Sequence, residues 1–348
     1  MVLALALCAV RGFSAYTAGK ATGNGSSLTV LNYGDYIERD VLDDFEEQTG
    51  IQVIYEEYET PETMYTKYKS GSIHYDLICS SDYMVEKLIG EGEVLPIDFS
   101  NIPNRRYINE DYYRYSESFD PQRALTVPYF AGTVGLLYNT KYVDEADMTS
   151  WNALWQKKYA NQIIMENSVR DSLIPALTLC GYSINTVEDG KLQEALQRLE
   201  EHKALNYAYL SDDAMYEMIM ENANLALIYS GEANAAMLEN ENLAYSVPKE
   251  GSNLWIDSWF IPKTCRHKPE AEAFLNFICD PEMAYASWDH VYYTTPNTGV
   301  YDMLDEEEQA DETMFPPKDV LERCEVFHAL PDEAIQRYNE LWKQLKVY

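Results

Sequence analysis

The sequence has few cysteines and histidines for its length, and their spacing excludes the common local metal sites. Its 348 residues include six cysteines and five histidines. No CxxC pair occurs, and the histidines form neither an HxH nor an HExxH motif. We therefore expect no metal site, no cofactor and no disulfide framework.

Basic residues and the usual catalytic motifs are scarce as well. Only 26 Lys and Arg oppose 58 Asp and Glu, for a net charge of -32. Such a charge repels phosphate groups, so we expect no nucleic-acid partner. A Walker A loop, a GxSxG elbow and a GxGxxG fingerprint are absent. These absences favour a binding protein over an enzyme.

Long hydrophobic runs are missing apart from the first ten residues, MVLALALCAV. That run is too short to span a bilayer and long enough for the core of a signal peptide. The Gly-, Ser- and Thr-rich segment that follows, up to residue 27, is typical of a flexible tether. We expect export, with either a cleaved leader or lipid attachment at Cys8, and order from about Leu28. The protein would then lie in the periplasm, or on the outer face of the cytoplasmic membrane as a lipoprotein.

Aromatic residues are abundant. The chain has 29 Tyr, 10 Phe and 6 Trp. Acidic groups neutralise cations, and ring faces attract them. The composition thus suits a cationic or a sugar ligand, and does not decide between them.

Strand and helix patterns alternate in the first part of the chain, which predicts parallel βαβ units. The expected strands are Ser27–Tyr33, Ile51–Tyr55 and Tyr75–Cys79. Ligands of such sheets lie beyond the carboxyl ends of the strands. The turns after Leu31 and Cys79, both polar and aromatic, are therefore expected to face a ligand.

The rest of the chain predicts a second α/β block with two connecting strands. The strand-like stretch Arg123–Asn139 contains Pro128 and two glycines and could pass from one domain into another. A block of strands and helices follows between about Trp151 and Val247, and Leu254–Pro262 has the pattern of a returning strand. The length and these patterns together indicate two domains.

Several motifs, in this order over about 270 residues, resemble the spermidine/putrescine-binding protein family, the extracytoplasmic receptors of polyamine ABC importers. They are Asn32-Tyr33-Gly34-Asp35-Tyr36, Tyr58-Glu59-Thr60-Pro61-Glu62-Thr63-Met64-Tyr65, Tyr75-Asp76-Leu77 with Ser81 and Tyr83, Val127-Pro128-Tyr129, Trp255-Ile256-Asp257-Ser258 and Thr295-Pro296-Asn297. The resemblance implies the type II periplasmic-binding-protein fold, two α/β lobes joined by two hinge strands. We expect lobe 1 to comprise residues 28–131 and 256–310 and lobe 2 residues 132–255 and 311–348, with residues 1–27 as leader and tether.

The resemblance also implies a polyamine ligand, putrescine or spermidine, and membrane permease subunits as partners of a monomeric receptor. Rings would cover the methylene groups of the ligand, while carboxylates would balance its ammonium charges. Trp255 and Asp257 are two residues apart on a strand and so share a face. Carried over by position, the ligand-binding residues are Tyr33, Gly34, Tyr36, Ser81, Tyr83, Asp171, Tyr229, Trp255, Asp257 and Tyr293.

The sequence departs from the family pattern at the second acidic pair. The family's Asp-x-x-Glu becomes Ser168-Val169-Arg170-Asp171, and a Gln near the carboxyl end falls on Phe327. Four further acids near the expected ligand loops could supply a carboxylate, but each is interpreted as a solvated charge and left out of the site. They are Asp35, Asp82, Glu166 and Glu232.

Two other functions stay open. Ferric-ion receptors use adjacent tyrosines, and this chain has Tyr112-Tyr113 and Tyr292-Tyr293. A secreted glycan-cleaving enzyme would also be acidic and aromatic, with a pair of catalytic carboxylates. No such pair stands in a recognisable sequence context.

Overall fold

The computed structural model describes residues 26–211 and 213–347. The expected leader, with Cys8, lies outside the described residues. The first strand begins at Ser27, one residue before the expected start of order.

The strands form a single mixed sheet. They are β1 (Ser27–Tyr33), β2 (Gln52–Tyr58), β3 (Leu77–Ser81), β4 (Val94–Leu95), β5 (Thr126–Asn139), β6 (Ile163–Glu166), β7 (Asn206–Leu210), β8 (Leu225–Tyr229), β9 (Leu243–Ser246) and β10 (Leu254–Pro262). Their order is β2-β1-β3-β10-β5-β8-β6-β7, with β4 on β10 and β9 on β5. β1 pairs in parallel with β2 and β3, and β6 pairs in parallel with β7 and β8, as expected for βαβ units.

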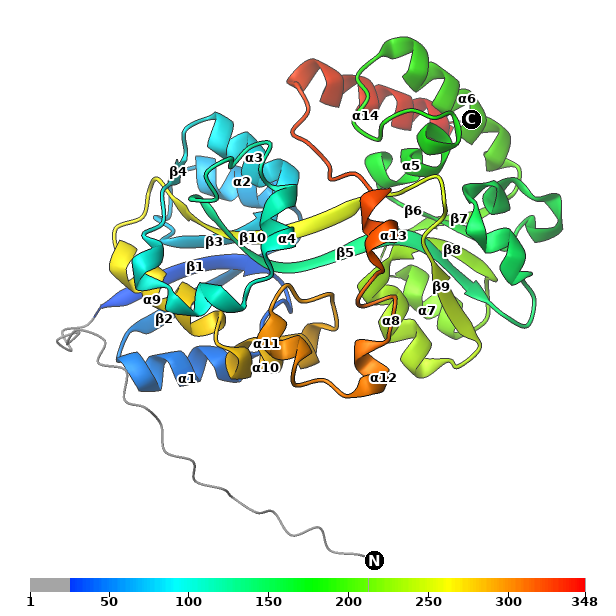
Figure 1. Cartoon of the computed structure of the whole chain (residues 1–348). Helices are drawn as coiled ribbons and strands as arrows, with labels where there is room; N and C mark the ends of the chain where they lie inside the picture. Colours follow the sequence, from blue (N-terminus) through cyan, green and yellow to red (C-terminus); the bar gives the residue numbers. More distant parts are fainter. Residues whose placement is uncertain (1–25, 212, 348) are drawn as a thin grey trace, which may run out of the picture.

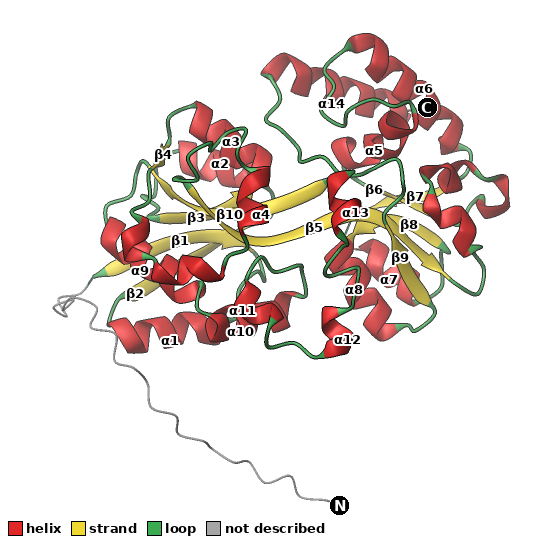
Figure 2. Cartoon of the chain, viewed as in Figure 1, coloured by secondary structure: helices red, strands yellow, loops and turns green. Residues whose placement is uncertain are grey.

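Helices cover both faces of this sheet (Figure 2). The α-helices are α1 (Arg39–Thr49), α2 (Pro61–Lys69), α3 (Asp82–Gly90), α4 (Glu110–Tyr115), α5 (Val169–Leu179), α6 (Asp189–Lys203), α7 (Asp213–Ile219), α8 (Ser230–Glu239), α9 (Lys268–Ile278), α10 (Pro281–Val291), α11 (Thr298–Tyr301), α12 (Glu306–Gln309), α13 (Lys318–Glu322) and α14 (Asp332–Val347). Short 3₁₀ helices span Phe99–Asn101, Pro103–Tyr107, Glu145–Thr149, Trp151–Trp155 and Lys157–Tyr159. Among the helices of the described residues, none combines the length and apolar character needed to cross a membrane.

The apolar side chains of the strands contribute to the hydrophobic core on both faces of the sheet. Val30 and Cys79 pack in the cluster that contains the apolar face of α1, whereas the neighbouring Leu31 and Ile78 pack with α2 and α3. Successive strand side chains point to opposite faces, so adjacent residues serve different helix layers. The β6–β8 region repeats this pattern, with α5 and α6 on one face and α7 and α8 on the other.

Two long antiparallel strands, β5 and β10, run side by side between the two ends of the sheet (Figure 1). Residues 126–133 of β5 pair with β10, while residues 134–139 pair with β8 and β9. All residues of both strands are buried. They are the two connecting strands that the sequence predicts.

β3 ends later than the sequence suggests. β1 ends at Tyr33, the last residue of the expected strand, whereas β3 continues to Ser81 rather than Cys79. Pairing of β3 with β10 as far as Asp257 holds the two additional residues in the sheet. α3 then begins directly at Asp82, where the sequence indicated only a polar turn. Residues 80–82, which the sequence placed in a turn, therefore lie at the end of β3 and the start of α3.

Candidate functional site

Asp257 lies in the middle of β10, opposite Ser81 at the end of β3. Its Oδ2 accepts a hydrogen bond of 2.6 Å from the hydroxyl of Tyr36, which belongs to the β1–α1 connection. Burial raises the pKa of the Asp257 carboxyl to about 7, although the Tyr36 and Tyr33 hydroxyls act in the opposite direction. A nearby positive charge would favour the ionised form of this carboxyl.

A continuous series of ring contacts leads away from this acid. The centroids of Tyr33 and Tyr36 are 5.1 Å apart, and those of Tyr36 and Tyr293 are 5.9 Å apart. Tyr293 contacts Trp255 at 5.0 Å, and Trp255 contacts Tyr229 at 6.4 Å. The contacts are edge-to-face, a favourable arrangement of ring quadrupoles. The series leads from β1, on one side of the β5–β10 pair, to β8, on the other side.

A second buried acid, Asp171, stands at the far end of the series. The Tyr229 hydroxyl donates a 2.9 Å hydrogen bond to its Oδ2. Asp171 lies in the first turn of α5, and Ser168 caps that helix by accepting the Asp171 amide at 3.5 Å. Burial raises the pKa of this carboxyl as well. The rings therefore lie between two buried carboxylic acids.

Two glycines make room for the rings. A Cβ at Gly132 of β5 would overlap the Trp255 indole, and a Cβ at Gly231 of α8 would overlap the Tyr293 ring. Gly132 is paired with Trp255 in the sheet register, so the indole lies over its own strand partner. The Trp255 and Tyr293 rings fit at these positions because glycine has no side chain.

Gly34 and Tyr83, two of the predicted site residues, make their contacts outside the series of rings. Gly34 is exposed and contributes a backbone hydrogen bond to Tyr58. The Tyr83 hydroxyl donates to Glu62 at 3.0 Å, so this phenol is engaged within its own region. Phe327 is covered by the Arg170 guanidinium at 3.8 Å, which also lies 5.8 Å from the Tyr83 ring.

The interpretation of the neighbouring acids as solvated charges is wrong for two of them. Glu166 and Asp82 are each only 4% exposed. Asp35 is exposed as expected, and Glu232 is half-buried. Burial raises the pKa of Asp82 well above its usual range and that of Glu166 to about 9. Burial of Glu166 could have been predicted from the sequence, because it directly follows the apolar residues Ile163–Met165 of β6.

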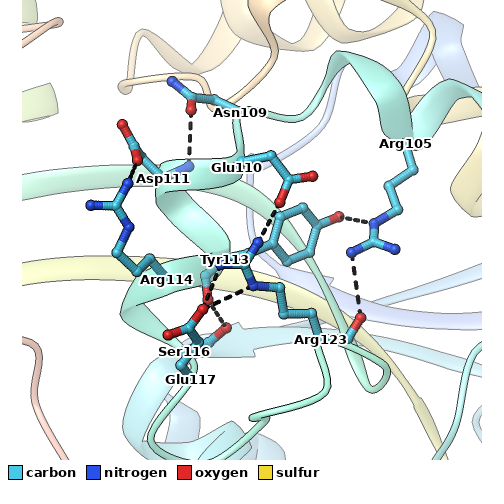
Figure 3. A network of polar contacts seen from close by, with 9 residues as sticks. All are labelled: Arg105, Asn109, Glu110, Asp111, Tyr113, Arg114, Ser116, Glu117 and Arg123. Atoms are coloured by element: carbon cyan, nitrogen blue, oxygen red, sulfur yellow. Dashed lines mark hydrogen bonds and ion pairs between the residues drawn. The ribbon is translucent and has the colours of Figure 1, made fainter.

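The two pairs of adjacent tyrosines, Tyr112-Tyr113 and Tyr292-Tyr293, make contacts within the protein. The Tyr113 hydroxyl accepts a hydrogen bond from Arg105 Nε at 3.2 Å within the network shown in Figure 3. The positive charge of this guanidinium opposes binding of a ferric ion at the same oxygen. Burial also raises the pKa of the Tyr113 phenol, which disfavours the phenolate form that binds iron. Tyr292 packs on Trp288, whereas Tyr293 packs on Trp255. Within residues 26–211 and 213–347, no three His, Cys, Asp or Glu side chains are grouped so as to hold a metal ion.

Comparison with known proteins identifies the family. Residues 40–316 match the sequence profile of the bacterial extracellular solute-binding proteins. The chain belongs to this family.

Relatives of this solute-binding protein are similar along nearly their whole length. The spermidine/putrescine-binding periplasmic protein of Salmonella typhimurium is 31% identical over 333 residues, covering 95% of this chain and 94% of the relative. The putrescine-binding periplasmic protein SpuD of Pseudomonas aeruginosa is 28% identical and covers 92% of this chain and 91% of its own.

A solved relative shares the fold. The spermidine/putrescine ABC transporter substrate-binding protein PotD of Streptococcus pneumoniae superimposes with a TM-score of 0.85 at 36% identity, over 93% of this chain and 99% of PotD. The predicted α/β periplasmic-binding fold, with two lobes joined by two strands, is thereby confirmed.

Proposed function

We propose that this solute-binding protein captures a polyamine, putrescine or spermidine, outside the cytoplasm and delivers it to the permease of an ABC importer. The ten residues that the resemblance assigns are proposed as its ligand-binding residues. The relatives whose names specify polyamines support this proposal. The protein would act as a receptor and leave its ligand chemically unchanged, as a solute-binding protein does.

One observation carries the proposal: the row of rings lies between two buried acids. Tyr36 holds Asp257 at one end, and Tyr229 holds Asp171 at the other. A diamine has the matching order of groups, with an ammonium at each end and methylenes between. Ring faces would cover the methylenes and attract the ammonium groups, and the carboxylates would balance charge removed from water.

The two connecting strands would act as a hinge. We propose that lobe 1 comprises residues 28–131 and 256–310 and lobe 2 residues 132–255 and 311–348. The chain would then cross between the lobes once in β5, once in β10 and once between residues 310 and 311. A ligand that contacts both lobes would shift the equilibrium toward the closed form. The permease would then recognise that form.

Isothermal titration calorimetry tests the proposal. At about 1.5 kcal/mol per non-hydrogen atom, even putrescine can reach roughly 9 kcal/mol, which permits micromolar binding or tighter. We expect one site per chain for putrescine or spermidine and no heat with glucose or neutral amino acids. Absence of binding for both polyamines would refute the proposed function.

A further inference from the structure

Glu166 lies where two parallel strands of the second α/β half end. It is the last residue of β6, which pairs in parallel with β8, the strand that ends at Tyr229. The carboxyl ends of adjacent parallel strands lie at the same edge of a sheet, where ligands of α/β proteins bind. Glu166 therefore stands at the edge that also presents Tyr229.

Its carboxyl group is buried and only partly satisfied. Glu166 is 4% exposed, and its Oε1 accepts the Asn167 amide at 3.1 Å. Its Oε2 has no hydrogen-bond partner among the described residues, nor does Oδ1 of Asp171, which is also 4% exposed. Buried polar atoms in folded proteins are nearly always paired. Asp171 also acts electrostatically on Glu166, so two carboxyl oxygens without a partner on these interacting acids suit a group that donates hydrogen bonds to both.

Two acids, Asp171 of α5 and Glu232 of α8, act on the Glu166 carboxyl. Burial raises the pKa of Glu166 to about 9, with Asp171 and Glu232 acting in the same direction and the Ser211 side chain and the Asn167 amide in the opposite one. Burial also raises the pKa of the Tyr229 phenol, and the charges of Asp171 and Glu166 add to that effect.

Two cations lie near this region. Lys346 of α14 donates to the side chain of Asn167, next to Glu166, at 3.0 Å, and Arg170 of α5 lies close enough to interact with Asp171. The two terminal nitrogens of the Arg170 guanidinium are engaged elsewhere, by the His328 carbonyl at 2.9 Å and by the Asn185 side chain at 2.8 Å.

We propose that Glu166 and Asp171 together form a subsite for one ammonium group of the ligand, with Glu166 supplying the carboxylate that Ser168 lacks. This inference rests on the proposed function and specifies how the site holds its second charge. Three ammonium hydrogens can be shared between Glu166 Oε2, Asp171 Oδ1 and the ring faces of Tyr229 and Trp255. Ser168 is free for its role as the cap of α5.

The arrangement couples ligand binding to proton release. In the free protein the Glu166–Asp171 pair retains a proton at neutral pH, because two carboxylates cannot both ionise cheaply in a buried site. An arriving ammonium ion reverses this preference, so the proton leaves to solvent as the ligand enters. Below the pKa of the pair, affinity rises with pH.

The test combines calorimetry with two variants. Putrescine is titrated into the full chain at pH 7.5 in buffers of different ionisation enthalpy, which gives the number of protons released. Glu166→Gln keeps the shape but removes the charge, and Glu200→Gln, on the exposed face of α6, is the matched control. We expect Glu166→Gln to weaken binding at least about tenfold and to lower proton release, while the control changes neither.

A rescue variant separates a local charge from a folding defect. Asp is as good a helix cap as Ser, so Ser168→Asp combined with Glu166→Gln returns an acid to the subsite and should recover most of the lost affinity. If wild-type protein binds putrescine but Glu166→Gln binds equally well, or the wild type releases no proton, the subsite is refuted while the proposed function stands. If wild-type protein binds no polyamine, the proposed function itself fails.

Discussion

At the scale of single residues, Asp257 is a buried acid in an aromatic environment. It is paired with a phenol at 2.6 Å, surrounded by rings and buried in the sheet. A carboxyl group in this setting is destabilised when ionised and unpaired, and an ammonium ligand removes that penalty. The free energy of ligand binding should therefore depend strongly on this one charge.

Replacing Asp257 by Asn tests that dependence. The amide keeps the shape and loses the charge, so we expect putrescine affinity to fall at least about tenfold, equivalent to about 1.4 kcal/mol. Asp43→Asn, on the exposed side of α1, is the matched control. Calorimetric dissociation constants give the comparison, and an unchanged constant for Asp257→Asn would show that another acid holds the ammonium group.

The raised pKa of Asp257 predicts a pH dependence of both stability and binding. Its value of about 7 exceeds the ordinary 3.8, so between these pH values the folded state binds more protons than the unfolded state. The contribution of Asp257 to the free energy of unfolding consequently falls as pH rises through this window. A cationic ligand reverses the trend, because it favours the ionised carboxyl.

Thermal denaturation with and without putrescine measures both effects. We expect the ligand-induced rise in melting temperature to be larger at pH 8 than at pH 5.5, and the difference to shrink in Asp257→Asn. A ligand effect that is the same at both pH values would contradict this account of the carboxyl.

At the scale of elements, the rings of the site are held by strand register and by glycine. Trp255 faces Gly132 across the β5–β10 pair, so any side chain at position 132 displaces the indole. The site therefore relies on the pairing of two connecting strands rather than on loops.

Gly132→Ala should damage both stability and binding. The new methyl group overlaps Trp255, and overpacking of this kind costs about 1–3 kcal/mol. Gly190→Ala provides the contrast, because nothing lies within 4 Å of a Cβ there and the residue is in α6, where Ala is preferred by roughly 0.5–1 kcal/mol. Denaturant unfolding should show a loss for the first variant and a gain for the second, and a neutral Gly132→Ala would mean that Trp255 can move freely.

Strand and helix periodicity made most of the elements predictable. The βαβ units and both connecting strands follow from apolar alternation and from capping residues such as Gly50, which ends α1 with φ of 71°. The exact end of β3 did not follow, because pairing with the distant β10 extends it. Burial of Asp82 was missed for a related reason, because only the folded sheet encloses the end of β3. Burial of Glu166 could have been predicted, since this residue directly follows an apolar strand.

At the scale of the whole molecule, a contact around His328, beside the proposed ligand site, joins the two halves. Glu86 of α3 accepts the Ala329 amide at 2.8 Å and lies 3.1 Å from His328 Nδ1. On its other side, the His328 carbonyl accepts from Arg170 of α5. The segment before α14, which packs with α5 and α6 (Figure 1), thus connects both halves of the molecule.

Removing this contact should weaken ligand retention without touching the ligand. Loss of a hydrogen bond worth about 1 kcal/mol predicts a roughly fivefold faster dissociation of putrescine from Glu86→Ala. Glu333→Ala, exposed on α14, is the control. Stopped-flow tryptophan fluorescence gives the rates, and equal rates for Glu86→Ala and wild type would show that the contact does not favour the closed form.

In the proposed site, an aromatic row with a buried acid at each end holds a molecule with two positive ends. Calorimetric titration with putrescine and with 1-butylamine, which has the same alkyl chain and a single ammonium group, tests this arrangement. We expect butylamine to bind at least about a hundredfold more weakly, because one buried acid is left without its partner. Equal affinity for the two amines would contradict it.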